Sequence, residues 1–146
     1  MRFGSAIKDA IGVAPATVNN TTVTCAIIDT QSFNFLHLPF WFGASDAAMT
    51  VLKLQESDDS GMSGATDVPG GDFTATLPGA TDDNHFWTWN VQLGGARKRY
   101  MRISATVGGT TGTTGAAVCC IGSLSKYSEA PFDATTEGAK YVLNIQ

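Results

Sequence analysis

Apolar and polar side chains alternate through much of the chain, and this pattern predicts short β-strands rather than helices. From Met101 to Val107 every second residue is apolar, and the residues between them are polar. The segments 21–28, 50–55 and 85–91 alternate in the same way. Because successive side chains of a strand point to opposite faces, each segment is expected to bury one face and expose the other.

Turn-forming residues separate these segments. The sequences Asp58-Asp59-Ser60-Gly61, Pro69-Gly70-Gly71 and Gly94-Gly95 are typical of turns, because Asp supports Asx turns and Gly accepts a positive φ. Further short strands are predicted at 33–42, 65–68, 73–77, 116–121 and 141–145. About eight short strands at roughly 8–12-residue spacing indicate an all-β protein, an antiparallel β-sandwich or jelly roll.

The first twenty residues differ from this pattern. Phe3, Ile7 and Ile11 have the spacing of one helical face, and Gly4 and Gly12 limit such a helix to about two turns. Residues 15–20 predict a linker. We therefore interpret residues 1–20 as an N-terminal arm and linker that docks on its own domain or on a neighbour, and residues 21–146 as a sandwich with a C-terminal tail. Deletion of residues 1–12 is expected to leave a folded protein.

The segment 33–42 is the most aromatic part of the chain. Its apolar parity changes between Phe35 and Leu36, which predicts a β-bulge or a strand that is apolar on both faces. Pro39 predicts that part of this strand lies at a sheet edge. Phe40 and Trp41 place aromatic rings on opposite faces, so a second sheet is expected to cover one ring and a partner subunit the other.

Composition narrows the classes of function. The 146 residues are 43% hydrophobic and only 15% charged, with a net charge of -4. A charge-rich disordered chain or coiled coil is excluded, and binding to nucleic acid or insertion in a membrane is not expected. The N-terminus lacks a signal-peptide apolar region, so synthesis in a reducing cytoplasm is expected, unless the chain is exported by assembly into something larger. The odd set Cys25, Cys119 and Cys120 is interpreted as buried thiols rather than as a metal site or redox pair.

The sequence holds little that is typical of catalysis. His37 and His85 are interpreted as structural or surface residues. The carboxylate pairs Asp58-Asp59 and Asp82-Asp83 fall in predicted turns and support calcium binding only weakly. No nucleophile elbow or phosphate-binding loop is present, so we predict no catalytic residue, no metal and no cofactor, and a protein that is not an enzyme.

Two further groups have both a structural and a functional interpretation. Arg97, Lys98 and Arg99 form the strongest local positive charge, either a solvated strand end or a contact for an acidic partner surface. Trp87 and Trp89 lie on one face of their strand, either as core residues or as a platform for sugars or a subunit interface.

Several segments resemble one family. Residues 51–61, VLKLQESDDSG, are similar to the LQESDDG hairpin of small virion proteins in tailed bacteriophages. Residues 98–107, KRYMRISATV, resemble the KRYVRL-AT strand of those proteins, and the order of Ile28-Asp29-Thr30, the hairpin and the Gly/Thr-rich loop 108–115 also agrees. The resemblance covers roughly residues 21–122, and the chain departs from the family in the extended region 62–84 and in the long tail 123–146.

The resemblance implies a head decoration (cement) protein with a jelly-roll-like domain, bound to the head surface of a virion and made in the bacterial host cytoplasm. Its implied partners are the major capsid protein and two further copies in a homotrimer. We expect Phe3, Ile7, Ile11, Phe40, Trp41, Arg97, Lys98 and Arg99, together with the tail 123–146, to provide partner contacts. The alternatives are a virion-attached module that binds a carbohydrate or receptor and, less favoured, a small jelly-roll hydrolase.

Overall fold

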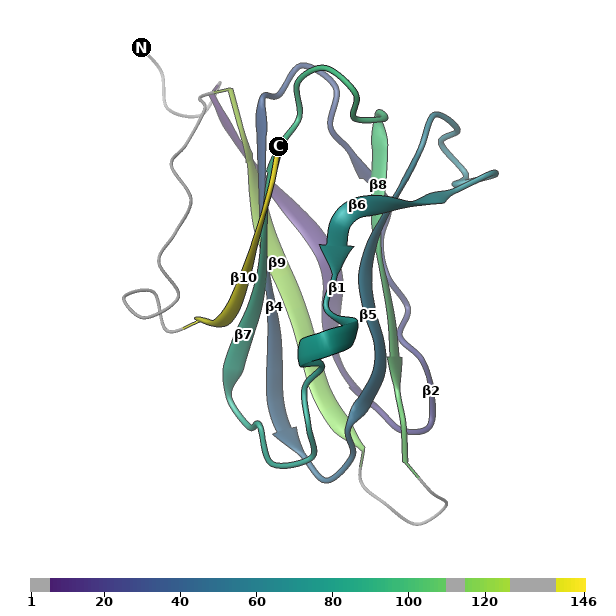
Figure 1. Ribbon diagram of the computed structural model, residues 1–146, viewed down its shortest axis with the longest axis vertical. Helices are drawn as coiled ribbons and strands as arrows, with labels where there is room; N and C mark the ends of the chain where they lie inside the picture. Colours follow the sequence, from purple (N-terminus) through teal and green to yellow (C-terminus); the bar gives the residue numbers. More distant parts are fainter. Residues whose placement is uncertain (1–5, 110–114, 127–138) are drawn as a thin grey trace.

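The computed structural model describes residues 6–109, 115–126 and 139–146, which form two five-stranded sheets packed face to face (Figure 1). Sheet A has the strand order β1 (Ile7–Val18), β9 (Ala116–Ser125), β4 (Phe35–Ser45), β7 (His85–Gln92) and β10 (Ala139–Ile145). Sheet B has the order β2 (Thr21–Thr22), β8 (Tyr100–Val107), β5 (Met49–Ser57) and β6 (Thr66–Asp72), and β3 (Ile28–Asp29) also pairs with β8.

The antiparallel strand pairs are nested along the chain. β5 pairs with β6, β4 with β7, β2 and β3 with β8, and β1 with β9. This is the pairing of one long hairpin that has rolled up into two sheets, and it defines a jelly roll. The tip of the hairpin is the turn after β5, where Asp59 Oδ2 accepts hydrogen bonds from the backbone N–H groups of Gly61 and Ser63 at 2.8 and 3.0 Å.

The predicted all-β sandwich is therefore confirmed, with two differences in detail. The structure has ten strands rather than about eight, because β1 was not predicted and the predicted strand 21–28 is divided into β2 and β3. The pairing is also not wholly antiparallel, since β10 runs parallel to β7. The regular alternation at 100–107 and 85–92 predicted β8 and β7 and the faces that they bury.

The helical prediction for the N-terminal segment is wrong. Residues 7–18 form β1, an edge strand of sheet A, and the pairs Ile7–Ser125 to Ile11–Ile121 join it to β9. Its register shifts between Ile11 and Val13 and again between Val13 and Ala16. These two irregularities interrupt the period-two pattern that marks a strand in a sequence. Deletion of residues 1–12 would remove five of these strand pairs, so it does not test docking alone.

The edge position predicted from Pro39 is also wrong. β4 lies in the centre of sheet A and pairs with β7 on one side and with β9 on the other. The pairing with β9 skips Leu38 and Pro39, between the His37–Ser123 and Phe40–Cys120 pairs. Gly122 lies beside this gap, where an added Cβ would be 2.0 Å from the carbonyl oxygen of His37. The sheet accommodates the missing N–H of proline by interrupting one ladder locally.

Two shorter predictions also differ from the structure. Residues 23–27 are not a strand, and Ile28 is buried there while Ile27 is exposed. Residues 74–76 form a 3-10 helix, η2 (Thr74–Thr76), rather than a strand. Asp72 Oδ1 accepts a hydrogen bond from the backbone N–H of Thr74 at 2.7 Å, and this turn competes with the extended conformation.

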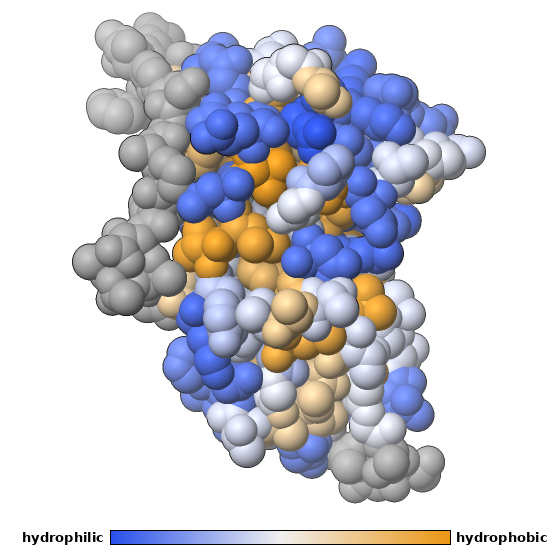
Figure 2. All heavy atoms as spheres, viewed as in Figure 1, coloured by the Kyte–Doolittle hydropathy of each residue, from blue (hydrophilic) through white to orange (hydrophobic). Residues whose placement is uncertain are grey.

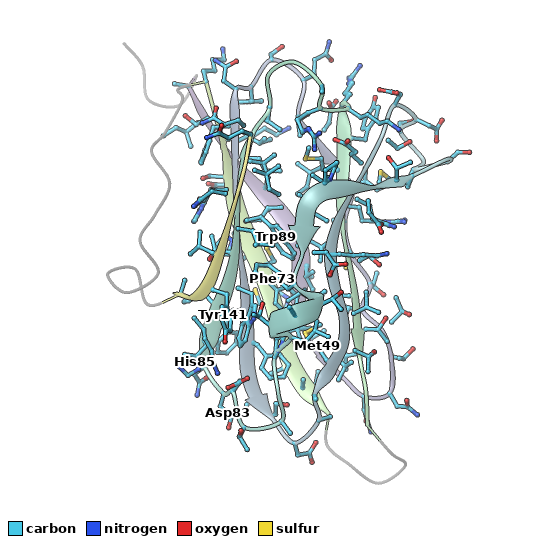
Figure 3. All side chains as sticks on the ribbon, viewed as in Figure 1. Met49, Phe73, Asp83, His85, Trp89 and Tyr141 are labelled. Carbon is cyan, nitrogen blue, oxygen red and sulfur yellow. The ribbon has the colours of Figure 1, made fainter. Side chains whose placement is uncertain are left out.

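The core fills the space between the sheets and includes both tryptophans of β7, and Trp89 lies between the sheets beside Phe73 (Figure 3). Both indoles are fully buried, and Phe73 packs on Trp89 with ring centroids 5.0 Å apart. Trp87 donates its indole N–H to the carbonyl of Thr76 at 2.7 Å, and Trp89 donates to Gly71 at 2.9 Å. The segment from β6 to η2 therefore satisfies both indoles and closes one side of the sandwich.

Candidate docking surface

The outer face of sheet A carries a line of apolar side chains. Ile11 of β1 is opposite Ile121 of β9, and both are more than half exposed, at 57% and 56%. Trp41 of β4 is opposite Cys119 of β9 and Phe86 of β7, and Phe86 is 36% exposed. Cys119 and Ile121 are two residues apart on one strand and share a face. We call these five residues the apolar band; it crosses four adjacent strands.

The local backbone allows Trp41 to lie along the sheet. Gly43 is the next residue on the same face of β4, and a Cβ added to it would be 2.8 Å from Cη2 of the Trp41 ring. The absence of a side chain at Gly43 therefore makes room for the indole beside the strand. The half-buried ring covers bare backbone and remains partly accessible from outside.

The expected aromatic contacts separate into two groups. Phe40 is fully buried and points into the core, so sheet B covers it, whereas Trp41 is on the outer face. Ile7 and Ile11 are exposed on β1, at 42% and 57%. Phe3 and most of the tail, 127–138, lie outside the described residues, as do residues 110–114 of the Gly/Thr-rich loop.

The side chains of the basic cluster, Arg97, Lys98 and Arg99, have partners within the chain. Nη1 of Arg97 lies 3.7 Å from Glu56 Oε1, and both side chains are almost buried. The backbone N–H of Lys98 donates to the other Glu56 oxygen at 3.1 Å, and its ammonium donates to Thr66 Oγ1 at 3.3 Å. Thus Arg97 and Lys98 help to hold the segment before β8 against β5 and β6.

Arg99 makes the most complete ion pair of the cluster. Its Nε and Nη2 donate to the two carboxylate oxygens of Asp29 at 2.9 and 2.8 Å. The hydrogen bonds from Arg99 lower the pKa of the Asp29 carboxyl to about 2, and the same pairing raises the pKa of Arg99. This pair ties β3 to the start of β8. Its partner is 70 residues away, which is why the sequence did not reveal it.

Neither tryptophan of β7 exposes a ring face in this structure, since Trp87 and Trp89 are both 0% exposed. The core interpretation of this pair is confirmed, and these rings do not form a stacking platform for a sugar. The aromatic surface lies on the opposite face of the same strand, at Phe86.

The three cysteines are free thiols. Burial raises the pKa of Cys25 to about 11 and also raises the pKa of Cys119 and of Cys120. A raised pKa keeps each thiol protonated at neutral pH, so these side chains act as small apolar groups.

The carboxylates of the predicted turns have structural partners. Asp82 Oδ2 accepts a hydrogen bond from the N–H of Gly79 at 2.8 Å, and Lys140 pairs with Asp82 and lowers the pKa of its carboxyl. Asp83 Oδ1 accepts from the N–H of Ser45 at 3.0 Å. Among the described residues, no group of three or more His, Cys, Asp or Glu side chains is placed to hold a metal ion.

The two histidines lie at different positions on sheet A. His37 Nδ1 is 2.8 Å from Asn90 Oδ1 on β7, and Asn90 Nδ2 donates to Asn144 Oδ1 on β10 at 3.1 Å. His85, which is exposed, is opposite Phe42 at the other end of the β4–β7 ladder. Polar cross-strand contacts thus adjoin the apolar band on the same sheet.

Three members of the apolar band were missed by the sequence analysis: Cys119, Ile121 and Phe86. The strand 116–121 is apolar at both parities, and this pattern was read as complete burial. Phe86 has the opposite parity to Trp87 and Trp89, which marks it as facing outward. Two apolar parities in adjacent strands are therefore the signal that could have located the band.

Comparison with protein-family models, with curated proteins and with solved structures finds no match for this chain. The described part of the chain also contains no helix with the length and apolar character needed to cross a membrane. The class defined by the fold is thus an all-β jelly-roll sandwich with an apolar outer face on sheet A.

Proposed function

We propose that this protein is a structural protein of a bacteriophage virion, a head decoration protein that binds the outer surface of the capsid. The observation that carries docking is the apolar band, in which Ile11 and Ile121 are a directly paired and largely exposed couple. The resemblance of residues 51–61 and 98–107 to small virion proteins supports a phage virion as the assembly. The major capsid protein is the proposed partner, and the protein acts as a homotrimer on the head.

The physical basis of such a role is burial and linkage. Covering apolar surface contributes about 25 cal/mol per Å² removed from water, and repeated contacts of a trimer multiply the effect through avidity. A protein that binds the assembled shell and not its separated subunits stabilises the shell by mass action. No catalytic step is needed for this function.

The apolar band is a better docking candidate than the basic cluster. Arg97 and Arg99 already have carboxylate partners in Glu56 and Asp29. Their positive charges are therefore largely compensated within the chain and attract an acidic partner surface less strongly. The band residues, in contrast, gain burial without losing an internal polar contact.

The experiment compares one acidic substitution on each outer face. Ile121→Asp introduces a charge into the band, and Val51→Asp is its matched control, because Val51 lies on the outer face of sheet B opposite Thr106. Each purified variant is added to capsids that lack decoration, and occupancy and capsid heat resistance are measured. We expect Ile121→Asp to lose binding and Val51→Asp to retain it.

Two outcomes would contradict the proposal at different points. Equal occupancy by both variants would show that the band is not the docking surface. Failure of the unmodified protein to bind any capsid, or to raise its heat resistance, would remove the decoration function itself. Sedimentation of the isolated protein tests the trimer separately, and a monomeric mass at the working concentration would contradict it.

A further inference from the structure

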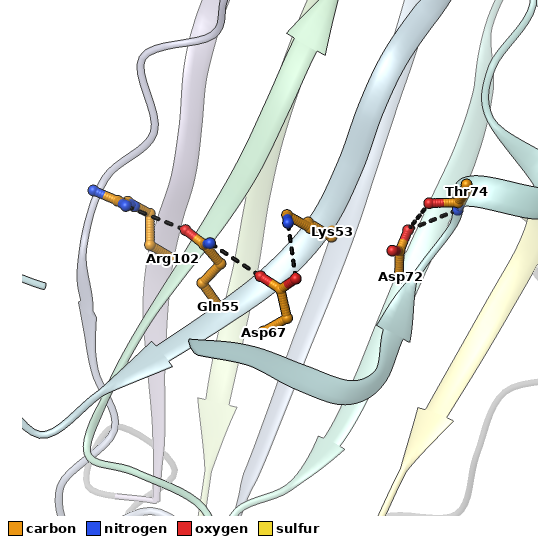
Figure 4. Close-up of polar contacts among 6 residues, drawn as sticks. All are labelled: Lys53, Gln55, Asp67, Asp72, Thr74 and Arg102. Carbon is orange, nitrogen blue, oxygen red and sulfur yellow. Dashed lines mark hydrogen bonds and ion pairs between the residues drawn. The ribbon is translucent and has the colours of Figure 1, made fainter. Parts of the chain in front are cut away.

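A line of polar contacts crosses the outer face of sheet B and ends on Arg102 (Figure 4). Lys53 Nζ donates to Asp67 Oδ2 at 2.8 Å, and Gln55 Nε2 donates to Asp67 Oδ1 at 3.0 Å. Gln55 Oε1 in turn accepts a hydrogen bond from Nη2 of Arg102 at 3.2 Å. Because Asp67 holds the amide nitrogen of Gln55, the amide oxygen is turned toward the guanidinium and holds it in one orientation.

Arg102 differs from the two other arginines of the described residues. Arg97 pairs with Glu56 and Arg99 pairs with Asp29, whereas no carboxylate of the described residues lies within 4 Å of the Arg102 guanidinium. Arg102 is also only partly exposed. A partly buried, oriented guanidinium with one neutral acceptor retains N–H donors for a further anionic acceptor.

The backbone beside Arg102 is opened by a gap in the sheet. Thr22 pairs with Thr106, Ile28 pairs with Met101, and the backbone N–H of Val23 still donates to the carbonyl of Ala105 at 2.9 Å. Residues 24–27 form no strand pair with β8. The gap contains a depression of about 300 Å³, lined by Thr22, Val23, Thr24, Cys25, Arg102, Ile103 and Ser104. Three residues with hydroxyl groups, Thr22, Thr24 and Ser104, therefore line the same depression as Arg102.

The charge of Arg102 acts within this depression. Burial raises the pKa of the Cys25 thiol, and the positive charge of Arg102 opposes that rise, because a cation favours a neighbouring anion. The same positive charge would attract an anion that enters the depression from solution. The net charge of the chain is -4, so any attraction for anions at this point is local.

We propose that this depression is a binding site for a carboxylate group, in which Arg102 supplies the charged donors and Thr24 and Ser104 supply hydroxyls. The planar fork of a guanidinium matches the two oxygens of a carboxylate. The space suits either a small carboxylic acid or the acidic side chain of a neighbouring protein. The site lies on the opposite sheet from the apolar band and does not depend on the proposed function.

The test is an NMR titration of the full chain at pH 7 and constant ionic strength. Acetate is the probe for a free acid, N-acetylglutamate amide is the probe for an acidic side chain, and acetamide is the neutral control. Saturable shifts of the Arg102 Nε–H and of the amides of residues 102–104 are expected with the acids and not with acetamide. Tighter binding of the glutamate amide would identify a side chain as the source, and equal binding would identify the carboxylate alone.

Variants make the result specific. Arg102→Gln is expected to weaken binding at least tenfold, by roughly 1.4 kcal/mol. Lys8→Gln, the matched control, removes the same charge from an exposed residue of β1 and is expected to leave binding unchanged. If Arg102→Gln does not fold, Ser104→Ala tests the hydroxyl in its place. Absence of saturable shifts, or equal weakening by Arg102→Gln and Lys8→Gln, overturns the proposal.

Discussion

The two sheets have similar inner faces and opposite outer faces. Inside, Leu38 and Phe40 of sheet A face Leu54 and Ile103 of sheet B, and all four are essentially buried. Outside, sheet B is tied together by the Lys53–Asp67–Gln55–Arg102 contacts, whereas sheet A presents the apolar band. Figure 2 looks onto the open side of the sandwich, where β10 ends sheet A and β6 ends sheet B, and shows apolar residues near these strands with hydrophilic residues above them and to the upper right.

The difference between the outer faces distinguishes the surfaces that stabilise the fold from the surface that is available to a partner. A sandwich is stable when one face of each sheet is covered, so the inner faces account for folding. The outer face of sheet B carries polar side chains that are hydrogen-bonded to one another. The outer face of sheet A exposes apolar side chains to water, although the stability of the fold does not require this exposure. Such an exposed apolar surface is typical of a site that binds a partner.

The largest expected effect tests whether the inner faces are equivalent. Leu38→Ala in sheet A and Leu54→Ala in sheet B each remove a fully buried side chain. We expect each to lower the free energy of unfolding by about 2–5 kcal/mol, because a cavity is added to the lost transfer free energy. Urea denaturation measures both. A loss below about 0.5 kcal/mol for either one would contradict its place in the shared core.

A smaller effect is expected from acid, and it belongs to sheet B. The pKa of Asp29 in the folded protein is about 2, below its ordinary value of about 3.9, so its contribution to stability is present above about pH 4. The contribution is lost as the pH falls from about 4 toward 2. Arg99→Gln removes the main cause of the shift and should flatten this part of the pH dependence. Denaturation curves between these pH values measure it, and an unchanged slope would contradict the assignment.

The smallest effect on stability is expected in the apolar band. Ile121→Ser changes an exposed side chain, so the free energy of unfolding should change by no more than about 0.5 kcal/mol. Binding of an apolar fluorescent dye should nevertheless decrease, because one of the two most exposed residues of the apolar band becomes polar. The matched Val51→Ser variant on sheet B should leave dye binding unchanged. Equal loss of dye binding in both would remove the contrast between the outer faces.

Regular strands were predictable from the sequence and irregular ones were not. β8 alternates without interruption, and its four inward side chains were all identified. β1 was missed because its register shifts between Ile11 and Val13 and again before Ala16. Ile7 and Ile11 are four residues apart, a spacing that fits one face of a helix as well as one face of a strand. Pro39 led to the wrong prediction of an edge position, because an interruption in the pairing of β4 with β9 allows a proline in a central strand.

The candidate sites were harder to predict because they depend on pairs that are distant in the sequence. Ile11 and Ile121 meet only because β1 pairs with β9, and Arg99 meets Asp29 only because β3 pairs with β8. A single sequence shows the chemistry of each residue but not its register partner. The face that a strand presents can be read from parity, whereas its neighbour across the sheet cannot.

The nested order of the jelly roll also sets a schedule for folding during synthesis. The hairpin of β5 and β6 is complete within 24 residues of chain, from Met49 to Asp72, and is free to form early. β1 must wait for β9, whose Ser125 pairs with Ile7. At translation rates of about 5–20 residues per second, that wait lasts roughly 6–24 s, during which the exposed isoleucines of β1 have no strand beside them. The bulges and Pro15 of β1 then act as protection, since an irregular strand is a poor template for pairing with another nascent chain.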